Sequence, residues 1–456
     1  MARGKKKESL TPEERLQAAL VPESEQPYKV PENWCWVTLQ TIDQYRSSNV
    51  DPSRQPNTYF ELYSVPSSAA NYPEIVMGSE IGSTKQSVEK GDVLLCKINP
   101  RINRVWKVSQ HTENTLLASS EWIIIRSSEM NSNFLMYCFR APYFRKYMLS
   151  NVSGVGGSLM RAQPKYVKTY PVPVPPFAEQ QRIVDRIESL FAKLDEAKQK
   201  AQEALDSFET RKAAILHKAF TGELTAQWRK DHGVGMECWK TKKLSEVSQL
   251  QTGLMKGKHY TGKTVMLPYL RVANVQDGFL NLDEIKEIEV SEEQVERYSL
   301  VAGDVLFTEG GDYDKLGRGT VWQGEIENCL HQNHIFVVRP HTDVLNPYFL
   351  SYQAGSRYGK QYFLKCSKQT TNLASINSTQ LKGFPVLMPT IEEQAQIVSQ
   401  IDSLLTKEQQ AKEAAQGVLE QIDLIKKAIL ARAFRGQLGT NDPSEERSVE
   451  KLQNII

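Results

Sequence analysis

Apolar side chains recur with a period near 3.5 residues in two separate stretches of the chain. Steps of four and three residues from Ile183 and from Ile397 meet an apolar side chain at nine of ten positions in each stretch. Such a sustained period is typical of helices that pack against each other in a coiled coil. Each stretch holds roughly 40 residues, so each predicted helix is about 60 Å long. The residues predicted to form the helix seam are Ile183, Ile187, Leu190, Leu194, Ile397, Ile401, Leu404, Val418 and Ile422.

The two stretches belong to an internal repeat. Residues 170–184 (YPVPVPPFAEQQRIV) match residues 384–398 (FPVLMPTIEEQAQIV) without a gap, and residues 212–224 match residues 426–438 at the same offset. The proline-rich segment before each helix indicates the exit from a globular domain. Repeats related by a two-fold axis would pair the helices antiparallel. Two alternatives stay open: each helix packs on its own domain or on another subunit, or the duplication has no functional meaning.

Before each helix, short strand-like runs such as WIIIRS and HIFVVRP mix with amphipathic stretches. The expected fold class is therefore α+β, with two globular domains in a pseudo-two-fold repeat joined by two long helices in an antiparallel coiled coil. The predicted parts are an N-terminal extension (1–27), a first globular domain (28–176), a first helix with its linker (177–234), a second globular domain (235–390), a second helix (391–439) and a C-terminal tail (440–456).

The two ends of the chain also resemble each other, as LTPEERLQAALV near the start and NDPSEERSVEKL near the end. If these segments pack together, Leu16 and Val449 should be in contact. That contact would close the structure into a ring of alternating domains and helices.

Charge is balanced overall but not locally. The chain of 456 residues has a formal net charge of +2, which is low for a protein that binds DNA alone through phosphate contacts. However, residues 130–178 and residues 344–391 contain no acidic side chain, and these stretches occupy matching places in the two halves. Basic side chains alternate there with tyrosine and amide side chains. The pattern indicates a phosphate-binding face with groups that could reach base edges.

The loops that follow Gly91 and Gly303 differ between the halves, as two unlike DNA half-sites would require. Arginine can hold guanine and asparagine can hold adenine through paired hydrogen bonds. The alternative is ordinary variation in surface loops. Lys256, Lys258 and Lys263 form a further basic loop that could contact the DNA backbone. With these and other polar residues of the second half, the candidate DNA-binding residues are Lys97, Asn99, Arg101, Asn103, Arg104, Arg161, Gln163, Lys165, Lys168, Lys256, Lys258, Lys263, Arg271, Asn274, Tyr313, Lys315, Arg318, Gln332, Asn333, Lys368, Gln369, Thr370 and Asn372.

Three patterns suggest chemistry but lack the required context. Residues 257–264 (GKHYTGKT) spell a P-loop, yet the next residues read as a strand and not as the helix that a P-loop needs. Cys329, His331 and His334 have a metal-like spacing, but strand alternation would turn the two histidines to opposite faces. Residues 346–348 (NPY) resemble part of an adenine-methyltransferase motif without its second proline. We expect no catalytic residue and no metal site.

The six cysteines are widely separated in the sequence, which is typical of reduced thiols in a cytosolic protein. No signal peptide and no run of about 18 apolar residues is evident, so we expect a cytoplasmic protein without contact to a membrane.

Taken in order, the motifs resemble the specificity subunits of type I restriction–modification systems. The resemblance rests on PVPPFAEQQRIV and PVLMPTIEEQAQIV, on the helix ends AFTGELTAQWR and AFRGQLGT, on KVPENWCWVTL, and on the run from LPYLRVANVQDG through GDVLFTEGGDYDKLGRG to HQNHIFVVRP. The second helix entry departs from the family pattern in its prolines but keeps Glu-Gln and Ile-Val. The resemblance covers nearly the whole chain.

The resemblance implies that each globular domain is a target recognition domain that reads one half of a bipartite site in double-stranded DNA. The helices would set the spacer and dock two modification subunits, which methylate adenine N6 with S-adenosylmethionine, together with ATP- and Mg-dependent restriction subunits. This chain would then be non-catalytic and hold no cofactor of its own. The competing hypotheses are a self-contained P-loop NTPase or methyltransferase, and a coiled-coil scaffold that does not bind DNA.

Overall fold

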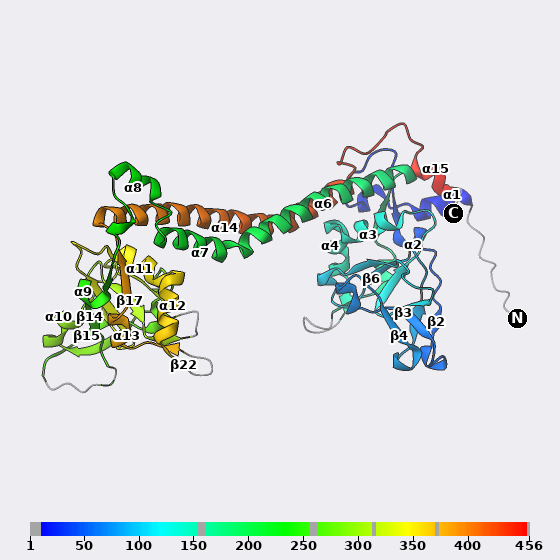
Figure 1. Ribbon diagram of the computed structural model, residues 1–456. Coiled ribbons are helices and arrows are strands. Elements are labelled where there is room, and N and C mark those ends of the chain that lie inside the picture. Colours follow the sequence, from blue (N-terminus) through cyan, green and yellow to red (C-terminus); the bar gives the residue numbers. More distant parts are fainter. Residues whose placement is uncertain are drawn as a thin grey trace. The chain divides into compact units, whose positions relative to one another are not determined.

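The computed structural model describes residues 11–153, 160–255, 257, 262–311, 316–369 and 374–453 (Figure 1). The chain separates into two compact units. Unit one consists of residues 1–201 and 417–456, and unit two of residues 202–416. Within the described residues, no helix combines the length and apolar character that a membrane span requires.

Unit one combines a mixed five-stranded sheet, in the order β2-β5-β8-β3-β4, with a three-stranded sheet in the order β7-β6-β9. Strands β3 and β8 run parallel, whereas the other pairs in these sheets are antiparallel. The elements are α1 (Pro12–Ala19), β1 (Cys35–Thr38), α2 (Leu39–Ile42), β2 (Asn49–Val50), β3 (Tyr59–Tyr63), β4 (Glu74–Met77), β5 (Lys85–Ser87), β6 (Val93–Cys96), β7 (Val105–Lys107), β8 (Thr115–Ala118), β9 (Trp122–Ile125), α3 (Ser132–Arg140), α4 (Pro142–Ser150), β10 (Val152–Ser153), β11 (Arg161–Ala162), α5 (Pro164–Val167), β12 (Pro171–Val174), α6 (Phe177–Asp206) and α15 (Ser448–Gln453).

Unit two contains a four-stranded sheet in the order β14-β21-β17-β19 and a three-stranded sheet in the order β16-β15-β20. Its helices and strands are α7 (Phe208–Phe220), α8 (Ala226–His232), β13 (Lys240–Lys243), α9 (Leu244–Val247), β14 (Ser248–Thr252), β15 (Thr264–Leu270), β16 (Lys286–Ser291), α10 (Val295–Tyr298), β17 (Val305–Thr308), β18 (Gly310–Gly311), β19 (Gly319–Val321), β20 (Leu330–His331), β21 (Ile335–Pro340), α11 (Pro347–Gly355), α12 (Arg357–Cys366), β22 (Lys368–Gln369), β23 (Ala374–Ser375), α13 (Ser378–Lys382), β24 (Pro385–Met388) and the first part of α14 (Ile391–Ala433).

The same local contacts occur at matched places in both units. Asn131 caps α3 by accepting hydrogen bonds from the next backbone N–H groups, and Asn346 caps α11 in the same way. The side-chain amide of Gln180 accepts a hydrogen bond from the backbone of Asn131 and donates one to the carbonyl of Pro175. Gln394 makes the same two hydrogen bonds, with Asn346 and Pro389. These contacts fix each long helix to the paired helices of its own globular part.

The long helices take part in the core of both units. In unit one, Ile183 and Ile187 of α6 are fully buried with Phe134, whose ring centroid lies 5.2 Å from that of Phe434 just after α14. In unit two, Leu216 of α7 packs with Ile397 and Ile401 of α14. Each long helix therefore packs on its own domain and also on a segment from the other half of the sequence.

In unit two, α7 and α14 run antiparallel. Lys412 lies over the ring of Phe208, and Glu408 accepts a hydrogen bond from Arg211 at 2.6 Å. Residues later in α7 therefore contact residues earlier in α14. Arg211 and Glu408 are the polar interruptions of the two apolar patterns. A polar pair within an apolar seam favours one register.

Two expectations about the helices were wrong. The first helix is not continuous, because a turn at Ser207 separates α6 from α7. The hydroxyl of Ser207 donates to the carbonyl of Glu203, and the guanidinium of Arg211 donates to the carbonyl of Ala204. These side chains compete with backbone N–H groups for the helix carbonyls, which favours a bend. The seam position Val418 is 41% exposed, whereas Ala415 and Ile422 are buried.

The two ends of the described chain pack together within unit one. Helix α1 contacts α15, and Leu16 is buried in the same cluster as Leu452 and Val449. The backbone of Ser448 also donates to the carbonyl of Asn33 at 3.0 Å. The two terminal segments therefore pack together, as their similarity predicted.

Two glycine substitutions should have opposite effects on stability. A Cβ at Gly319 in β19 would overlap the carbonyl oxygen of Leu306 on the paired strand, whereas a Cβ at Gly417 in α14 meets no atom within 4 Å. We expect Gly319→Ala to lower the free energy of unfolding by about 2 kcal/mol. Gly417→Ala should raise it by roughly 0.4–1 kcal/mol, because alanine restricts the unfolded chain. Denaturant titration of both variants measures this, and equal midpoints would contradict the strand geometry.

Candidate nucleic-acid interface

In unit one, the loop after β6 and a short hairpin form one surface, which we call the first basic loop (residues 97–104) and its hairpin (β10–β11). The loop contains a 3-10 turn at Pro100–Ile102, flanked by Asn99 and Asn103 with left-handed φ angles of 48° and 54°. The backbone of Cys96 donates to the carbonyl of Arg104 at 3.0 Å and closes the loop. Asparagine tolerates this backbone region better than most residues, because its short polar side chain adds little strain.

The hairpin is held against the loop through its backbone. Asn99 donates to the carbonyl of Met160 and Ala162 donates to that of Lys97, each at 2.8 Å. This pairing brings Arg161, which lies far along the sequence, next to the loop. The structure thus gathers Lys97, Asn99, Arg101, Asn103, Arg104 and Arg161 on one part of unit one.

This surface carries an excess of positive charge. Glu121 pairs with Arg161 at 3.1 Å and accepts a backbone hydrogen bond from Lys97. Arg145, which was not among the candidates, donates to the carbonyl of Arg101. Its place in the acid-free stretch was the signal that could have identified it. Among the described residues, Glu121 is the carboxylate that pairs with a cation of the loop and hairpin, and the remaining positive charge suits a phosphate-rich ligand.

The asparagines of the first basic loop are turned partly inward. The side-chain oxygens of Asn99 and Asn103 are buried and have no hydrogen-bond partner among the described residues. Their role in this structure is to form the loop backbone. The exposed Arg101 is better placed than either asparagine to reach a base edge.

Unit two repeats this construction after β17. The backbone of Thr308 donates to the carbonyl of Arg318 at 3.0 Å, which closes a second loop (residues 309–318). This loop has three acidic and two basic residues, so it lacks the positive charge of the first. Strand β18 in this loop pairs with β23, and β23 pairs with β22. Ile376 donates to the carbonyl of Glu309 at 2.8 Å, as Ala162 does to Lys97 in unit one. Lys368 and Arg318 thus belong to one assembly of loop and hairpin.

Several candidates in unit two have structural partners. Asn274 is buried and its amide donates to the carbonyls of Asn281 and Glu284. The guanidinium of Arg271 also donates to Glu284, and that of Arg318 donates to Gln276 at 3.1 Å. Gln332 and Asn333 lie in the turn between β20 and β21, and Lys263 precedes β15.

In unit one, Lys165 lies over the ring of Tyr166, Lys168 pairs with the buried carboxylate of Asp43 at 3.6 Å, and Gln163 precedes α5. The candidates Lys256, Lys258, Tyr313, Lys315, Thr370 and Asn372 lie outside the described residues, and Gln369 is described only as part of β22.

The three patterns that suggested chemistry have structural roles here. The P-loop pattern leads into β15 and not into a helix. Asn346 of the NPY segment is a helix cap. His334 contacts Glu309, whereas His331 is fully buried and shares a hydrogen bond with the carbonyl of Ile335. No cluster of three metal-binding side chains occurs among the described residues.

His331 makes the stability of unit two depend on pH. Burial lowers the pKa of this imidazole from 6.5 to about 4, so the folded chain keeps it neutral. The unfolded chain binds a proton below pH 6.5, and stability is therefore lost as the pH falls from 6.5 toward 4, by at most about 3 kcal/mol. Denaturant unfolding at pH 7.5 and pH 5 should show this loss in the wild type. The loss should shrink in His331→Gln, and an equal loss in both chains would refute this role.

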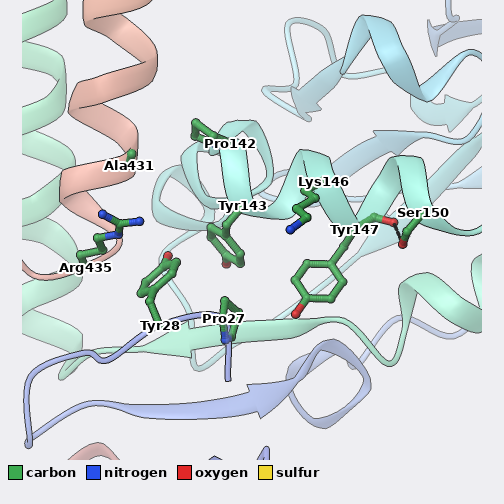
Figure 2. Close-up of a pocket in the computed structure, with 9 residues that line it drawn as sticks. All are labelled: Pro27, Tyr28, Pro142, Tyr143, Lys146, Tyr147, Ser150, Ala431 and Arg435. Carbon is green, nitrogen blue, oxygen red and sulfur yellow. Dashed lines mark hydrogen bonds between the residues drawn. The ribbon is translucent and has the colours of Figure 1, made fainter. Parts of the chain in front are cut away.

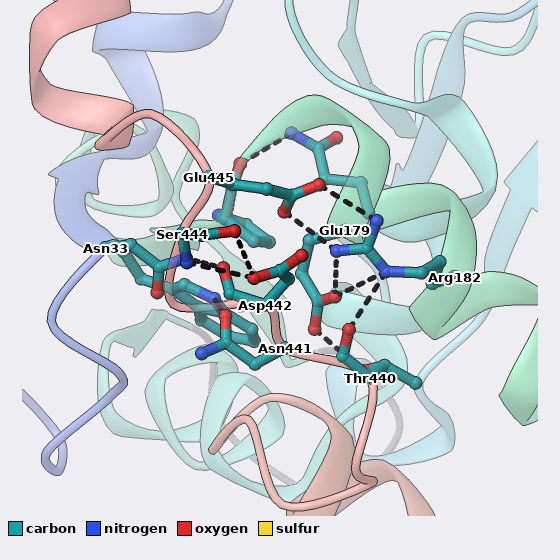
Figure 3. Close-up of polar contacts among 11 residues, drawn as sticks. Asn33, Glu179, Arg182, Thr440, Asn441, Asp442, Ser444 and Glu445 are labelled. Carbon is teal, nitrogen blue, oxygen red and sulfur yellow. Dashed lines mark hydrogen bonds and ion pairs between the residues drawn. The ribbon is translucent and has the colours of Figure 1, made fainter.

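A second contact set ties the loops after the long helices to the helix starts. In unit one, the buried Glu179 of α6 accepts hydrogen bonds from Thr440 at 2.7 Å and from Arg182 (Figure 3). Arg182 also pairs with Glu445, and Asn33 donates to the carbonyl of Asp442. In unit two, the buried Glu393 of α14 accepts from Thr225, Arg229 and Trp239.

The comparison with known proteins agrees with this architecture. The family model described as "Type I restriction modification DNA specificity domain" matches twice, at residues 53–205 and 236–418. The EcoKI specificity subunit of Escherichia coli K12 is 26% identical over 309 residues, which is 67% of this chain and 66% of that protein. The StySPI specificity subunit of Salmonella potsdam is 25% identical over 68% of this chain and 66% of its own length. The chain thus spans just under two thirds of these relatives.

The fold is also similar to solved structures. The crystal structure of the HsdS subunit from Thermoanaerobacter tengcongensis has a TM-score of 0.66 and 22% sequence identity, and the match covers 91% of this chain and 100% of that one. A chain from a structure of a type I restriction–modification complex has a TM-score of 0.64 and 22% identity over 90% of this chain and all of its own length. Because the family model matches twice and covers most of the sequence, the chain belongs to the type I restriction–modification DNA specificity family.

Proposed function

We propose that this chain is the DNA-reading subunit of a type I restriction–modification complex, with each unit reading one part of a bipartite site in double-stranded DNA. The observation that carries the proposal is the paired construction of loop and hairpin in the two units. A backbone frame of the same kind recurs in both units, whereas its side chains differ between them. A common frame with different side chains is what two unlike half-sites require.

The long helices have a proposed role in spacing and assembly. Antiparallel pairing of α14 with α6 and α7 would set the unread spacer between the half-sites and dock two modification subunits, and restriction subunits would join them. In support, Lys426 of α14 pairs with Asp195 of α6 at 2.6 Å in unit one, and Arg211 pairs with Glu408 in unit two. Leu424 and Ile425 of α14 remain exposed, as a helix with a further partner would leave them.

The chain itself is proposed to be non-catalytic. S-adenosylmethionine, ATP and Mg would bind to the partner subunits, and adenine would be methylated there after it leaves the DNA stack. The described residues that looked like chemical motifs cap a helix, enter a strand or lie in the core. This assignment leaves recognition and assembly as the tasks of this chain.

A methylation map tests the proposal. The chain is expressed with its modification subunit in a host without adenine methylation, and the genomic DNA is sequenced for modified adenines. We expect a two-part motif with a fixed gap that disappears when this chain is omitted. Exchange of residues 235–385 for those of another family member should change one half of the motif only. Methylation at a continuous site, or methylation that does not need this chain, would overturn the proposal.

A further inference from the structure

A pocket of about 500 Å³ lies in unit one between the segment before β1, helix α4 and the turn after α14 (Figure 2). The rings of Tyr28, Tyr143 and Tyr147 line it together with the side chains of Lys146 and Arg435. Figure 2 shows Arg435 beside Tyr28, and Lys146 between Tyr143 and Tyr147. Neither cation belongs to the basic loop or its hairpin, so the pocket is a separate feature of unit one.

Unit two has a pocket of about 300 Å³ at the matching place, between the end of α7 and the start of α12. Tyr143 is the second residue of α4, and Tyr358 is the second residue of α12. Arg435 directly follows the buried Phe434, and Thr221 directly follows the buried Phe220. The two pockets therefore occupy the same position in the repeated fold.

Each pocket is lined by at least one lysine or arginine side chain, but these side chains lie at positions that do not match in the repeat. Lys146 and Arg435 line the first pocket, whereas His217 and Arg357 line the second. The described lining residues of both pockets include no carboxylate, although Glu25 acts on Tyr147 from outside the lining. Duplication alone would keep the residues in place. Basic character maintained by residues at changed positions indicates a common requirement for an acidic ligand.

The first pocket also contains a hydroxyl group without a partner. The Tyr28 hydroxyl is buried and makes no hydrogen bond with a described residue. Burial raises its pKa, so the group stays protonated and can donate. The guanidinium of Arg435 lies 5.0 Å from the centre of the Tyr28 ring. An incoming carboxylate could accept from this hydroxyl and pair with Arg435 at the same time.

We propose that each pocket receives a carboxylate-bearing peptide segment, one from each of two identical copies of a partner protein. This inference rests on the proposed function, in which two modification subunits dock on the chain. A few hundred Å³ can hold one or two side chains of a segment and cannot hold a DNA duplex. The tyrosine rings supply apolar contact to a peptide, and the basic groups select an acidic one.

Charge reversal in one pocket at a time tests the inference on the full chain. Lys146→Glu with Arg435→Glu alters the first pocket, and His217→Glu with Arg357→Glu alters the second. The exposed residues Lys90 and Lys240 provide the matched controls Lys90→Glu and Lys240→Glu. Binding of the modification subunit is titrated by sedimentation velocity. We expect two copies per chain for the wild type and both controls, with at least a tenfold loss of affinity for one copy in each pocket variant.

Other outcomes separate the hypotheses. Two copies bound with wild-type affinity in both pocket variants would overturn this inference and leave the proposed function intact. A wild-type chain that binds no modification subunit would instead refute the docking role itself. Reduced DNA affinity with unchanged partner binding would identify the pockets as phosphate sites and also overturn the inference. If a reversal lowers the melting temperature, Lys146→Gln with Arg435→Gln should still weaken partner binding.

Discussion

Glu393→Ala is expected to lower the free energy of unfolding by about 3–5 kcal/mol, because it leaves a buried charge without its partner. The carboxylate of Glu393 is fully buried and accepts hydrogen bonds from Arg229 at 2.6 Å, Thr225 at 2.7 Å and Trp239 at 3.0 Å. The guanidinium of Arg229 is itself buried and has no other carboxylate among its described partners. Denaturant unfolding followed by circular dichroism measures the loss.

Two comparison variants show whether the buried pair is the cause. Glu392 is exposed one position earlier on α14, so Glu392→Ala should change stability by less than about 0.5 kcal/mol. Glu179→Ala should cost less than Glu393→Ala, because Arg182 is more exposed and keeps an ion pair with Glu445. A loss that is the same in all three variants would contradict this account.

Arg101→Ala is expected to weaken binding of the assembled complex to its DNA site by about 5- to 150-fold, the range for loss of one paired arginine–base contact. Arg101 is exposed on the first basic loop, and Arg145 holds its backbone carbonyl. If it contacts a base, the loss should be confined to one half-site. If it contacts a phosphate, affinity should fall for all sequences and the salt dependence should become less steep.

Arg54→Ala is the matched control for Arg101→Ala, since Arg54 is an exposed arginine of unit one outside the basic loop. Affinity should stay within twofold of wild type in a fluorescence anisotropy titration. Equal affinity of Arg101→Ala and wild type, with unchanged melting temperature, would remove the first basic loop from the DNA interface.

The periodic elements were the part of the fold that the sequence predicted well. Helix α6 begins at Phe177 and α14 at Ile391, directly after the proline-rich segments, because proline ends the preceding strand and fits the entry to a helix. The break at Ser207 was missed. It depends on side-chain hydrogen bonds to helix carbonyls, which leave the apolar period unchanged.

The candidate interface was predictable only in part. Arg161 was selected for its charge, yet its place beside the first basic loop depends on backbone pairing between Lys97 and Ala162. Asn274 looked equally suitable for binding DNA in the sequence. In the structure its amide group donates hydrogen bonds to carbonyl groups of its own loop. Residue type indicates what a side chain can bind, whereas burial and local partners decide whether it is available.

The division of the chain has a consequence for its synthesis. Unit two is a single continuous segment, so all of its residues have been made once Gln416 is added. Unit one needs the end of α14 and α15 to bury Phe134, Leu16 and Trp34. At about 5–20 residues per second, its first part must wait for tens of seconds on the ribosome with this surface uncovered. The second half of the gene product is therefore able to fold first, and the first half is the part that needs protection from aggregation.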